Sequence, residues 1–324
     1  MTPSTGAAPT LPAVTVAVST FRRKHLLPRL VSALEAQTIG VSSIELVIVD
    51  DASQDGTAEI LTELAASSPM QITVLVAEVN GGPAVGRNRA WRVASAEVIA
   101  FTDDDCVPTP GWLEAGLAAA APGNVVVGQT QPAPDQLAHE GVFSRTLRVT
   151  DARFMQTCNV IYQKQTLLDL DGFEESFRTG EDTDLGLRAV ESGLEAVFVP
   201  EALVHHDVRP SDLRAKLRES RSWVDLPLVV RRHPQVRKSY LYGSLFWKKS
   251  HPLAILFLAA PFLALLQPAA AVLVVPWLWW RWRKEPLAAS PVTRLQTLPA
   301  ALLIDLTEVY TMVRGSLRHG ALVL

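Results

Sequence analysis

The stretch that decides the fold runs from Val47 to Thr57 and has the sequence VIVDDASQDGT. Its β-branched apolar run leads directly into two carboxylates, and Ser53 and Asp55 follow where the next helix would begin. Ser and Asp are preferred N-cap residues, so the polar residues fit helix capping alone. They also fit a ligand site, because open α/β sheets bind ligands beyond the carboxyl ends of their strands. On that second interpretation, Asp51 accepts a hydrogen bond from an N–H group of a nucleotide base.

Strands and helices alternate on both sides of this stretch. We expect strands at residues 14–18, 45–49, 72–77 and 98–101, with helices at 26–36, 55–66 and 83–94. This alternation predicts a doubly wound, mostly parallel α/β sheet with flanking helices. A more mixed region follows, with strands expected at 125–127 and 197–199 and a helix at 182–192.

A run of three carboxylates, Asp103–Asp105, follows the strand expected at 98–101. Adjacent carboxylates repel one another unless a cation or solvent offsets their charge. At the end of a buried strand a divalent ion is the simplest answer, because Mg²⁺ and Mn²⁺ prefer oxygen ligands and leave positions open for phosphate oxygens. A solvated acidic turn is the alternative.

Three further features supply candidate functional groups. Asp182 lies at the expected start of a helix, where the helix dipole favours an ionised carboxylate that can take a proton from a hydroxyl group. One imidazole of His205–His206 can complete a metal site. Gly81–Gly82 precede a helix and let the backbone approach a ligand, whose phosphate Arg87 can meet. Each feature alone also fits a structural role, as an acidic helix start, a structural histidine pair or a plain turn.

Taken in order, these motifs resemble the successive motifs of glycosyltransferase family 2. The resemblance is carried by Val18–Arg23 (VSTFRR), Val49–Ser53 (VDDAS), Asn80–Gly82 (NGG), Arg87–Asn88, Asp103–Asp105, Gly172–Phe173 and Glu181–Asp182. It covers residues 12–210, roughly two thirds of the chain. The resemblance implies the GT-A fold and a Mn²⁺ or Mg²⁺ cofactor. It also implies inverting transfer of a sugar from a nucleotide-diphosphate donor, with a UDP-sugar as the first expectation.

The resemblance also implies roles for individual residues. Asp182 matches the catalytic base, and the metal ligands are matched by Asp103, Asp105 and His206. The positions that match nucleotide-sugar-binding motifs are Ser19, Thr20, Asp51, Gly81, Arg87, Asn88 and Asp104. The positions expected on the acceptor side are Trp112, Asn159 and Glu181.

The chain departs from the family pattern in three places. Phe21–Arg22 stands where tyrosine and asparagine are usual, and Asp171–Phe173 stands where Gly-Gly-Phe is usual. Processive synthases carry a Gln-x-x-Arg-Trp motif, whereas Arg218–Trp223 has the sequence RESRSW. This last difference favours addition of one or a few sugars over extrusion of a polymer.

Two other functions remain as alternatives. A nucleotidyltransferase also combines a nucleotide-binding α/β sheet with acidic metal ligands. It normally has a glycine-rich basic loop after the first strand, where Ser19–Arg23 contains no glycine. A catalytically silent membrane scaffold with the same fold would not require the acidic motifs that this chain keeps.

The last third of the chain has a different composition. Residues 211–250 are basic and predict an amphipathic helical connector, whereas no charged residue occurs between Leu253 and Trp280. Lysines precede this apolar segment, and tryptophans with arginines follow it, which is typical of a membrane interface. Pro268 near its middle predicts a re-entrant or tightly paired hairpin, with one tilted span or a buried hairpin of a soluble protein as alternatives.

We therefore expect a flexible tail at 1–12, a glycosyltransferase domain at 13–210, and a membrane hairpin with an amphipathic helix at 251–324. Basic residues at both ends of the hairpin predict the cytoplasmic face of the cell membrane. The expected acceptor is then a lipid-linked or cell-envelope glycan. The net charge of −3 gives no case for a nucleic-acid partner, and the two distant cysteines indicate a reducing compartment rather than a disulfide framework.

Overall fold

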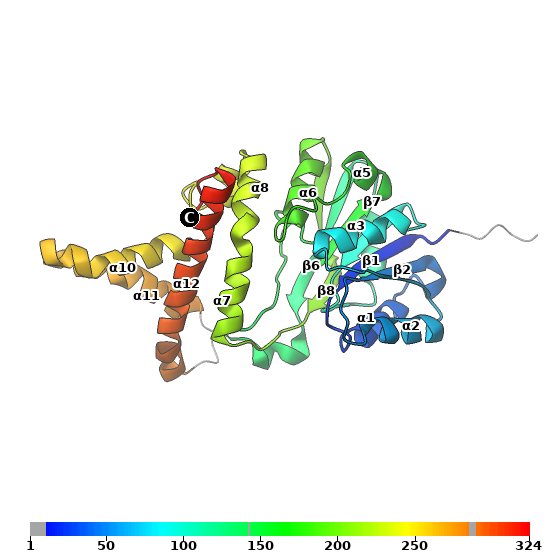
Figure 1. Cartoon of the computed structure of the whole chain (residues 1–324), viewed down its shortest axis with the longest axis horizontal. Coiled ribbons are helices and arrows are strands. Elements are labelled where there is room, and N and C mark those ends of the chain that lie inside the picture. The colour runs from blue at the N-terminus through cyan, green and yellow to red at the C-terminus, as the bar shows by residue number, and fades with distance from the viewer. Residues whose placement is uncertain (1–10, 142, 285–289) are drawn as a thin grey trace, which may run out of the picture. The chain divides into compact units, whose positions relative to one another are not determined.

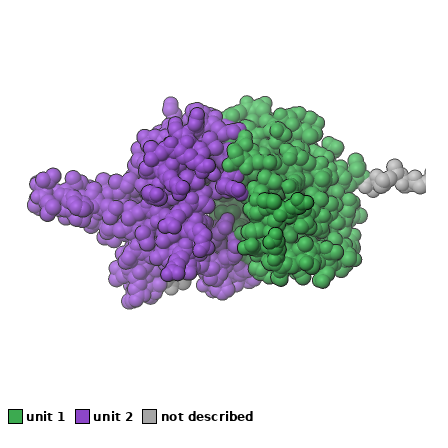
Figure 2. Space-filling model, viewed as in Figure 1, with its two compact units in different colours: residues 1–134, 147–176, 181–207 green, residues 135–146, 177–180, 208–324 purple. Residues whose placement is uncertain are grey.

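The structure, a computed structural model, describes residues 11–141, 143–284 and 290–324. Most of the expected tail at 1–12 lies outside these ranges. The chain divides into two compact units, shown in Figure 2, and each is described by itself. Unit 1 comprises residues 1–134, 147–176 and 181–207, and unit 2 comprises residues 135–146, 177–180 and 208–324. The last segment of unit 1 ends at residue 207, and the expected domain boundary at 210 stays a prediction.

Unit 1 is built on an eight-stranded sheet with the strand order β3-β2-β1-β4-β7-β6-β8-β5 (Figure 1). The strands are β1 (Val14–Thr20), β2 (Ile44–Asp50), β3 (Gln71–Val76), β4 (Val98–Thr102), β5 (Cys106–Pro108), β6 (Asn124–Pro132), β7 (Asn159–Gln163) and β8 (Glu195–His206). β1 to β4 run parallel, β7 is antiparallel to both β4 and β6, and β5 is antiparallel to β8. The predicted parallel half is therefore confirmed, and the complete sheet is mixed.

Six helices of unit 1 cover the faces of this sheet. They are α1 (Leu27–Glu35), α2 (Thr57–Ser67), α3 (Pro83–Val93), α4 (Trp112–Ala119), α5 (Lys164–Asp169) and α6 (Glu181–Glu191), with a short 3₁₀ turn, η1, at Val41–Ser43. β1 and β2 are buried along nearly their whole length, as expected for strands with helices on both faces. This burial on both faces explains why the sequences of β1 and β2 are nearly continuous apolar runs.

The strand order places a topological switch point at one edge of the sheet. The chain moves outward from β1 to β3 and then crosses back to β4, so β1 and β4 flank the point where the order reverses. Thr20 lies opposite Asp50 in the register, and Ala17 lies opposite Phe101. The carboxyl ends of β1, β2 and β4 therefore meet at the same edge, where such folds bind ligands.

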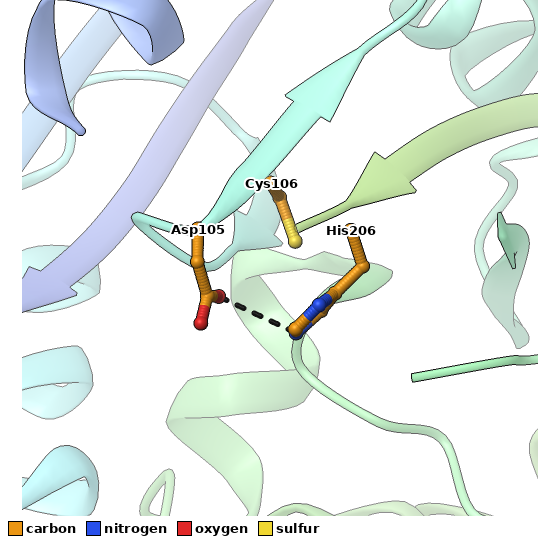
Figure 3. Close-up of side chains that lie close together, drawn as sticks. All are labelled: Asp105, Cys106 and His206. Atoms are coloured by element: carbon orange, nitrogen blue, oxygen red, sulfur yellow. Dashed lines mark ion pairs between the residues drawn. The ribbon is translucent and has the colours of Figure 1, made fainter. Parts of the chain in front are cut away.

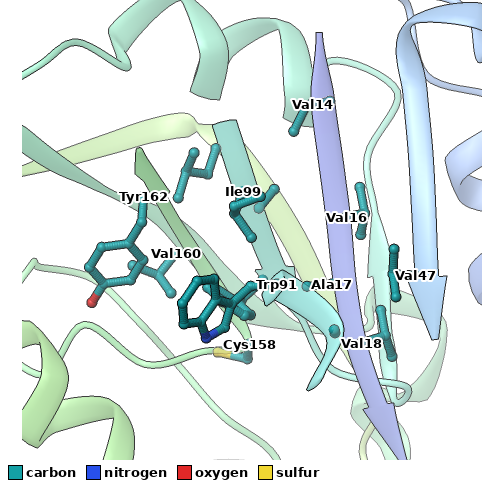
Figure 4. Packing of buried hydrophobic residues seen from close by; sticks show 14 of the residues in the cluster. Val14, Val16, Ala17, Val18, Val47, Trp91, Ile99, Cys158, Val160 and Tyr162 are labelled. Atoms are coloured by element: carbon teal, nitrogen blue, oxygen red, sulfur yellow. The ribbon is translucent and has the colours of Figure 1, made fainter. Parts of the chain in front are cut away.

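The core of unit 1 lies around β1, β4 and β7, as Figure 4 shows for 14 of its side chains. Phe101 packs edge-on against Phe173, with ring centroids 5.1 Å apart, and against Tyr162 at 6.2 Å. These rings lie on strands and loops next to the acidic run Asp103–Asp105. The acidic residues are thus anchored by a close-packed apolar layer beneath them.

Unit 2 is helical in the residues that the structure describes. Its helices are α7 (Leu213–Ser222), α8 (Leu226–Arg232), α9 (Val236–Tyr240), α10 (Ser250–Leu266), α11 (Val275–Lys284) and α12 (Pro291–His319), with 3₁₀ turns η2 (Pro134–His139, which begins in unit 1), η3 (Trp223–Asp225) and η4 (Pro268–Val274). The helical connector expected at 211–250 is divided into α7, η3, α8 and α9. α10, η4 and α11 fold back on one another, and within the described ranges no helix has the length and apolar character needed to cross a bilayer.

Candidate active site

Asp105 and His206 converge at the carboxyl-end edge of the sheet, as Figure 3 shows. The imidazole Nε2 of His206 lies 3.4 Å from a carboxylate oxygen of Asp105, and both residues are almost fully buried. With Cys106 they form a group whose potential ligand atoms all lie within 4.8 Å of one another. The expected pairing of an acidic strand end with a late histidine is therefore present in the fold.

Backbone pairing explains why residues a hundred positions apart meet here. β5 pairs antiparallel with β8, and the register sets Cys106 opposite His206. The backbone N–H of Asp207 then donates to the carbonyl of Asp105 over 2.9 Å. Asp207 itself is ion-paired with Arg29 of α1, which holds this end of β8 against the helix.

The hydrogen bond of the imidazole fixes its tautomer. Its Nδ1 lies 2.8 Å from the carbonyl oxygen of Asp207, and a carbonyl can only accept, so Nδ1 carries the proton. In the neutral ring, the lone pair of Nε2 then faces a carboxylate oxygen of Asp105. Two lone pairs at this distance repel unless a proton or a metal ion lies between them.

Arg87 joins the acidic run to the start of α6. Its guanidinium donates to Glu181 over 2.7 Å and to Asp103 over 2.8 Å, while the residue is only 7% exposed. Burial alone would lower the pKa of Arg87, but the charges of Asp103 and Glu181 outweigh it and raise that pKa above its ordinary value. The carboxylate of Asp103 is therefore engaged by Arg87 and stands outside the group of Asp105, Cys106 and His206.

Asp104 lies between the ends of β1 and β4. It accepts from the hydroxyl of Thr20 over 2.6 Å and from Arg23 over 2.6 Å, and Arg23 also reaches Asp105 over 3.1 Å. Burial raises the pKa of Asp104, and the cation of Arg23 opposes that rise. Arg23 is thus a positive charge placed directly on two of the three adjacent carboxylates.

Asp182 lies at the start of α6, in the first helical turn, as predicted. One carboxylate oxygen accepts from the backbone N–H of Thr183 over 2.7 Å. Burial, followed by the negative charge of Glu181, raises the pKa of Asp182 to about 7. Such a carboxyl group changes its protonation state near neutral pH, which suits it for accepting a proton from a hydroxyl group.

Negative charge predominates in the described part of this region. Five carboxylates, on Asp103, Asp104, Asp105, Glu181 and Asp182, lie around the two guanidinium groups of Arg23 and Arg87. Buried charges are costly unless they are paired. Excess negative charge, together with the facing lone pairs of Asp105 and His206, fits a divalent cation. Burial raises the pKa of the Cys106 thiol well above its ordinary value, so oxygen and imidazole ligands suit that cation better than sulfur.

Asp51 is hydrogen-bonded to the backbone of the loop that contains Gly81 and Gly82. Its two carboxylate oxygens accept from the backbone N–H groups of Gly81 and Gly82, each over 2.8 Å. The following residue, Ala52, has a φ of 62°, a left-handed conformation that non-glycine residues rarely adopt. The base-contacting role expected for Asp51 stays a prediction, and its hydrogen bonds show that it also holds two loops together at the carboxyl-end edge of the sheet.

Ser19 marks a close approach between β1 and α3. A Cβ atom placed on Gly86 would come within 2.1 Å of the Ser19 hydroxyl oxygen. Glycine at this position therefore lets the first turns of α3 reach the end of β1. This contact brings Arg87, the next residue, to the acidic run.

Three of the residues predicted to contact substrate have hydrogen bonds within the chain, and their substrate-binding roles stay predictions. Asn88 is fully buried and bonds to Phe173, Trp91 and Glu175, so it holds the loop around Gly172. Asn159 and Trp112 are also fully buried, and the indole N–H of Trp112 donates to the Asn159 amide oxygen over 2.8 Å. The Asn159 amide nitrogen donates to the carbonyls of Gln129 and Ala202, which makes these side chains internal braces of the sheet.

Two residues of the site were not assigned a role from the sequence, Arg23 and Cys106. Arg23 could have been found as a basic residue in the loop after the first strand, because that loop ends at the same sheet edge as Asp103–Asp105. Cys106 and the three-residue strand β5 carry no such signal. A strand this short has no readable period, and its pairing with β8 exists only in the fold.

Comparisons with known proteins agree with this geometry. Residues 15–178 match glycosyl transferase family 2, and residues 98–283 match glycosyl transferase family group 2. Glycosyltransferase AglE of Haloferax volcanii is 24% identical over 210 residues, which cover 62% of this chain and 69% of that protein. The pre-mycofactocin glycosyltransferase of Mycobacterium tuberculosis is 27% identical over 211 residues, and the match spans 60% of this chain but 43% of that protein.

Solved structures show the same fold at low identity. Mannosyltransferase PcManGT from Pyrobaculum calidifontis, in complex with GDP-Man and Mn²⁺, has a TM-score of 0.58 and 19% identity, covering 96% of this chain and 87% of that one. S. aureus TarS 1–349, in complex with UDP, has a TM-score of 0.53 and 18% identity, covering 95% and 91%.

The mixed sheet with flanking helices and the acidic residues beyond β1 and β4 define a GT-A-type glycosyltransferase that uses a nucleotide-sugar donor. The family match over residues 15–178 spans half of the chain, and the chain belongs to glycosyltransferase family 2.

Proposed function

We propose that the protein is an inverting, metal-dependent transferase that moves single sugars from a nucleotide-diphosphate donor to a hydroxyl group of its acceptor. The acceptor is a lipid-linked or cell-envelope glycan at the cytoplasmic face of a membrane. Two observations support the catalytic part: Asp105 lies against His206, and Arg87 joins Asp103 of the same acidic run to Glu181, the neighbour of the base candidate Asp182. The residues come from the turn before β5 and from β8, α3 and α6.

The donor would lie along the ends of β1 and β2. The backbone around Gly81–Gly82 offers close approach to the nucleotide, and Arg23, with 27% of its side chain exposed, offers a cation toward the diphosphate. Asp105 and His206 would hold a divalent cation, with Asp103 held nearby by Arg87, and the bound ion would stabilise the diphosphate as a leaving group. The Mn²⁺ and GDP-Man in PcManGT support this type of donor complex.

Asp182 supplies the proton acceptor. In the ionised form it takes the proton of the acceptor hydroxyl, whose oxygen attacks the anomeric carbon from the side opposite the diphosphate. A single displacement of this kind inverts the configuration of the sugar. Arg87, through its bond to Glu181, keeps the adjacent residues in place and lowers the pKa of Asp182 against the effects of burial and Glu181.

The test is nucleotide release from a panel of UDP-, GDP- and dTDP-sugars, with a membrane lipid extract as acceptor. UDP-sugars are our first expectation, and UDP and UDP-GlcNAc bound to TarS support including them. We expect release with at least one donor, complete loss in EDTA, and recovery with Mn²⁺ or Mg²⁺. Full activity in a chelator would remove the metal from the proposal. Release of pyrophosphate from a sugar phosphate and a nucleoside triphosphate would instead identify a nucleotidyltransferase.

A further inference from the structure

The hairpin of unit 2, formed by α10, η4 and α11, exposes many large apolar side chains. At the end of α10, Phe262 is 73% exposed, Leu265 84% and Leu266 85%, and Val272 of η4 is 64% exposed. We call these four residues the tip of the hairpin. Figure 1 shows α10 running away from α12 toward this tip. Contiguous apolar surface of this kind marks an interaction site.

Among the residues that the structure describes, α12 of unit 2 covers one side of the hairpin. Ala254 of α10, Trp277 of α11 and Ala301 of α12 form a buried cluster, and the rings of Phe257 and Trp277 lie 4.8 Å apart. The remaining surface of α10 is equally apolar, since the helix contains no charged residue after its N-cap, Lys249. Helices that are apolar on all sides lie in a protein core or in lipid.

The opposite end of the hairpin, which we call its base, carries aromatic rings paired with cations. Arg283 lies over the ring of Trp279 at 4.5 Å, and Lys249 lies 6.0 Å from the ring of Trp280. Tryptophan beside Lys or Arg is favoured at the level of lipid headgroups. The apolar tip and the base, with its aromatic and cationic side chains, thus lie at opposite ends of the hairpin.

The charge of the segment that contains the hairpin indicates what kind of partner it binds. Residues 226–284 contain nine Lys and Arg residues and no Asp or Glu. Such a segment is attracted to an anionic lipid surface and repels a second copy of itself. A bilayer that contains anionic lipids therefore fits this surface better than a homodimer does.

The turn at the tip is suited to an apolar environment. A backbone N–H group in hydrocarbon must be paired inside the chain. The N–H of Gln267 donates to Leu263, the N–H of Ala270 donates to Gln267, and Pro268 has no N–H. α10 has 17 residues, which is about 26 Å along its axis and shorter than the hydrocarbon core of roughly 30 Å.

We infer that this hairpin inserts into one leaflet of an anionic bilayer, with its tip in the hydrocarbon and its base among the headgroups, and that it does not cross. The inference extends the proposed function to a defined lipid-binding surface and does not depend on Asp182 or the metal site.

Vesicle flotation of the full chain tests it, with phosphatidylcholine vesicles that contain or lack about 30% phosphatidylglycerol. We expect binding to the anionic vesicles, weakened by high salt. The variant Phe262→Ser/Leu265→Ser/Leu266→Ser should bind at least about tenfold more weakly, because it removes apolar surface and no charge. A dye attached at Leu265→Cys should shift to the blue on binding.

Two matched control variants distinguish vesicle binding by the tip from nonspecific adsorption of exposed apolar residues and from effects of lost catalysis. The variant Val76→Ser/Val93→Ser/Leu168→Ser removes exposed apolar residues of unit 1, and Asp182→Asn removes the proposed base. Both should bind vesicles like the wild type. Unchanged vesicle binding in the tip variant would overturn the inference, as would a tip variant whose only change, by light scattering, is from dimer to monomer.

Discussion

Arg87→Met removes the cation that joins the acidic run to the start of α6. Methionine fills a similar volume without charge, so the variant tests the ion pairs rather than packing. Asp103 and Glu181 would then lose their shared partner, and Asp182 would lose a positive charge that lowers its pKa. We expect lower stability and a base that ionises above its wild-type pKa of about 7.

The magnitude follows from burial. Arg87 is 7% exposed and its ion pairs with Glu181 and Asp103 are 2.7 and 2.8 Å long. Removing one partner of a buried pair typically costs about 3–5 kcal/mol. For a domain of this size each kcal/mol lowers the melting temperature by about 2–4 °C. The expected fall in Tm is therefore about 6–20 °C, measured by differential scanning calorimetry.

Arg92→Met is the matched control. Arg92 lies on the same helix but is exposed, and its ion pairs with Asp171 and Glu175 are 3.7 and 3.6 Å long. Exposed pairs contribute about 0–1 kcal/mol, so Tm should change by no more than about 4 °C. The double variant Arg87→Met/Glu181→Gln should recover part of the loss. Equal melting temperatures for the Arg87 and Arg92 variants would refute the buried-pair account.

The remaining predictions concern the base, the acidic run and the glycine approach. Asp182→Asn should bind donor normally in calorimetry but turn over about 10²–10⁴-fold more slowly, and wild-type turnover would exclude Asp182 as the base. Because that carboxyl must be ionised to act and its pKa is raised to about 7, wild-type kcat/KM should rise with pH, reach half its maximum near pH 7 and level off about one pH unit higher, whereas a flat profile would contradict the assignment. Arg23→Ala removes the guanidinium that is bonded to Asp104 and Asp105. Mn²⁺ affinity, measured by electron paramagnetic resonance, should therefore increase about tenfold while the donor KM rises. Unchanged Mn²⁺ affinity would mean that Arg23 does not compete with the ion. Gly86→Ala puts a Cβ 2.1 Å from the Ser19 hydroxyl oxygen and should lower the free energy of unfolding by about 1–3 kcal/mol. Gly111→Ala, with open space around the added Cβ, should lower it far less. Similar losses of stability in both variants would contradict the close approach.

Much of unit 1 could be predicted from local sequence. The strands β1 to β4 and the helices between them have long apolar runs, and their predicted bounds agree with the structure within about two residues. Asp182 at the start of α6 and Asp105 at the end of a strand were also predictable, because helix starts and strand ends have characteristic polar residues. The antiparallel strands β5 and β7 were missed, since three and five residues carry too little periodicity.

The sequence by itself determined which chemical groups are present and at which end of each helix or strand they lie. Whether a polar residue faces the carboxyl-end edge of the sheet or the core was decided only by tertiary structure. Asn88 and Asn159 carry the same amide groups that bind substrates elsewhere, yet here both are fully buried and hydrogen-bond to segments distant in the sequence. The physical reason is that burial depends on contacts between distant segments. Arg87 meets Glu181 across 94 positions, and no local pattern encodes that distance.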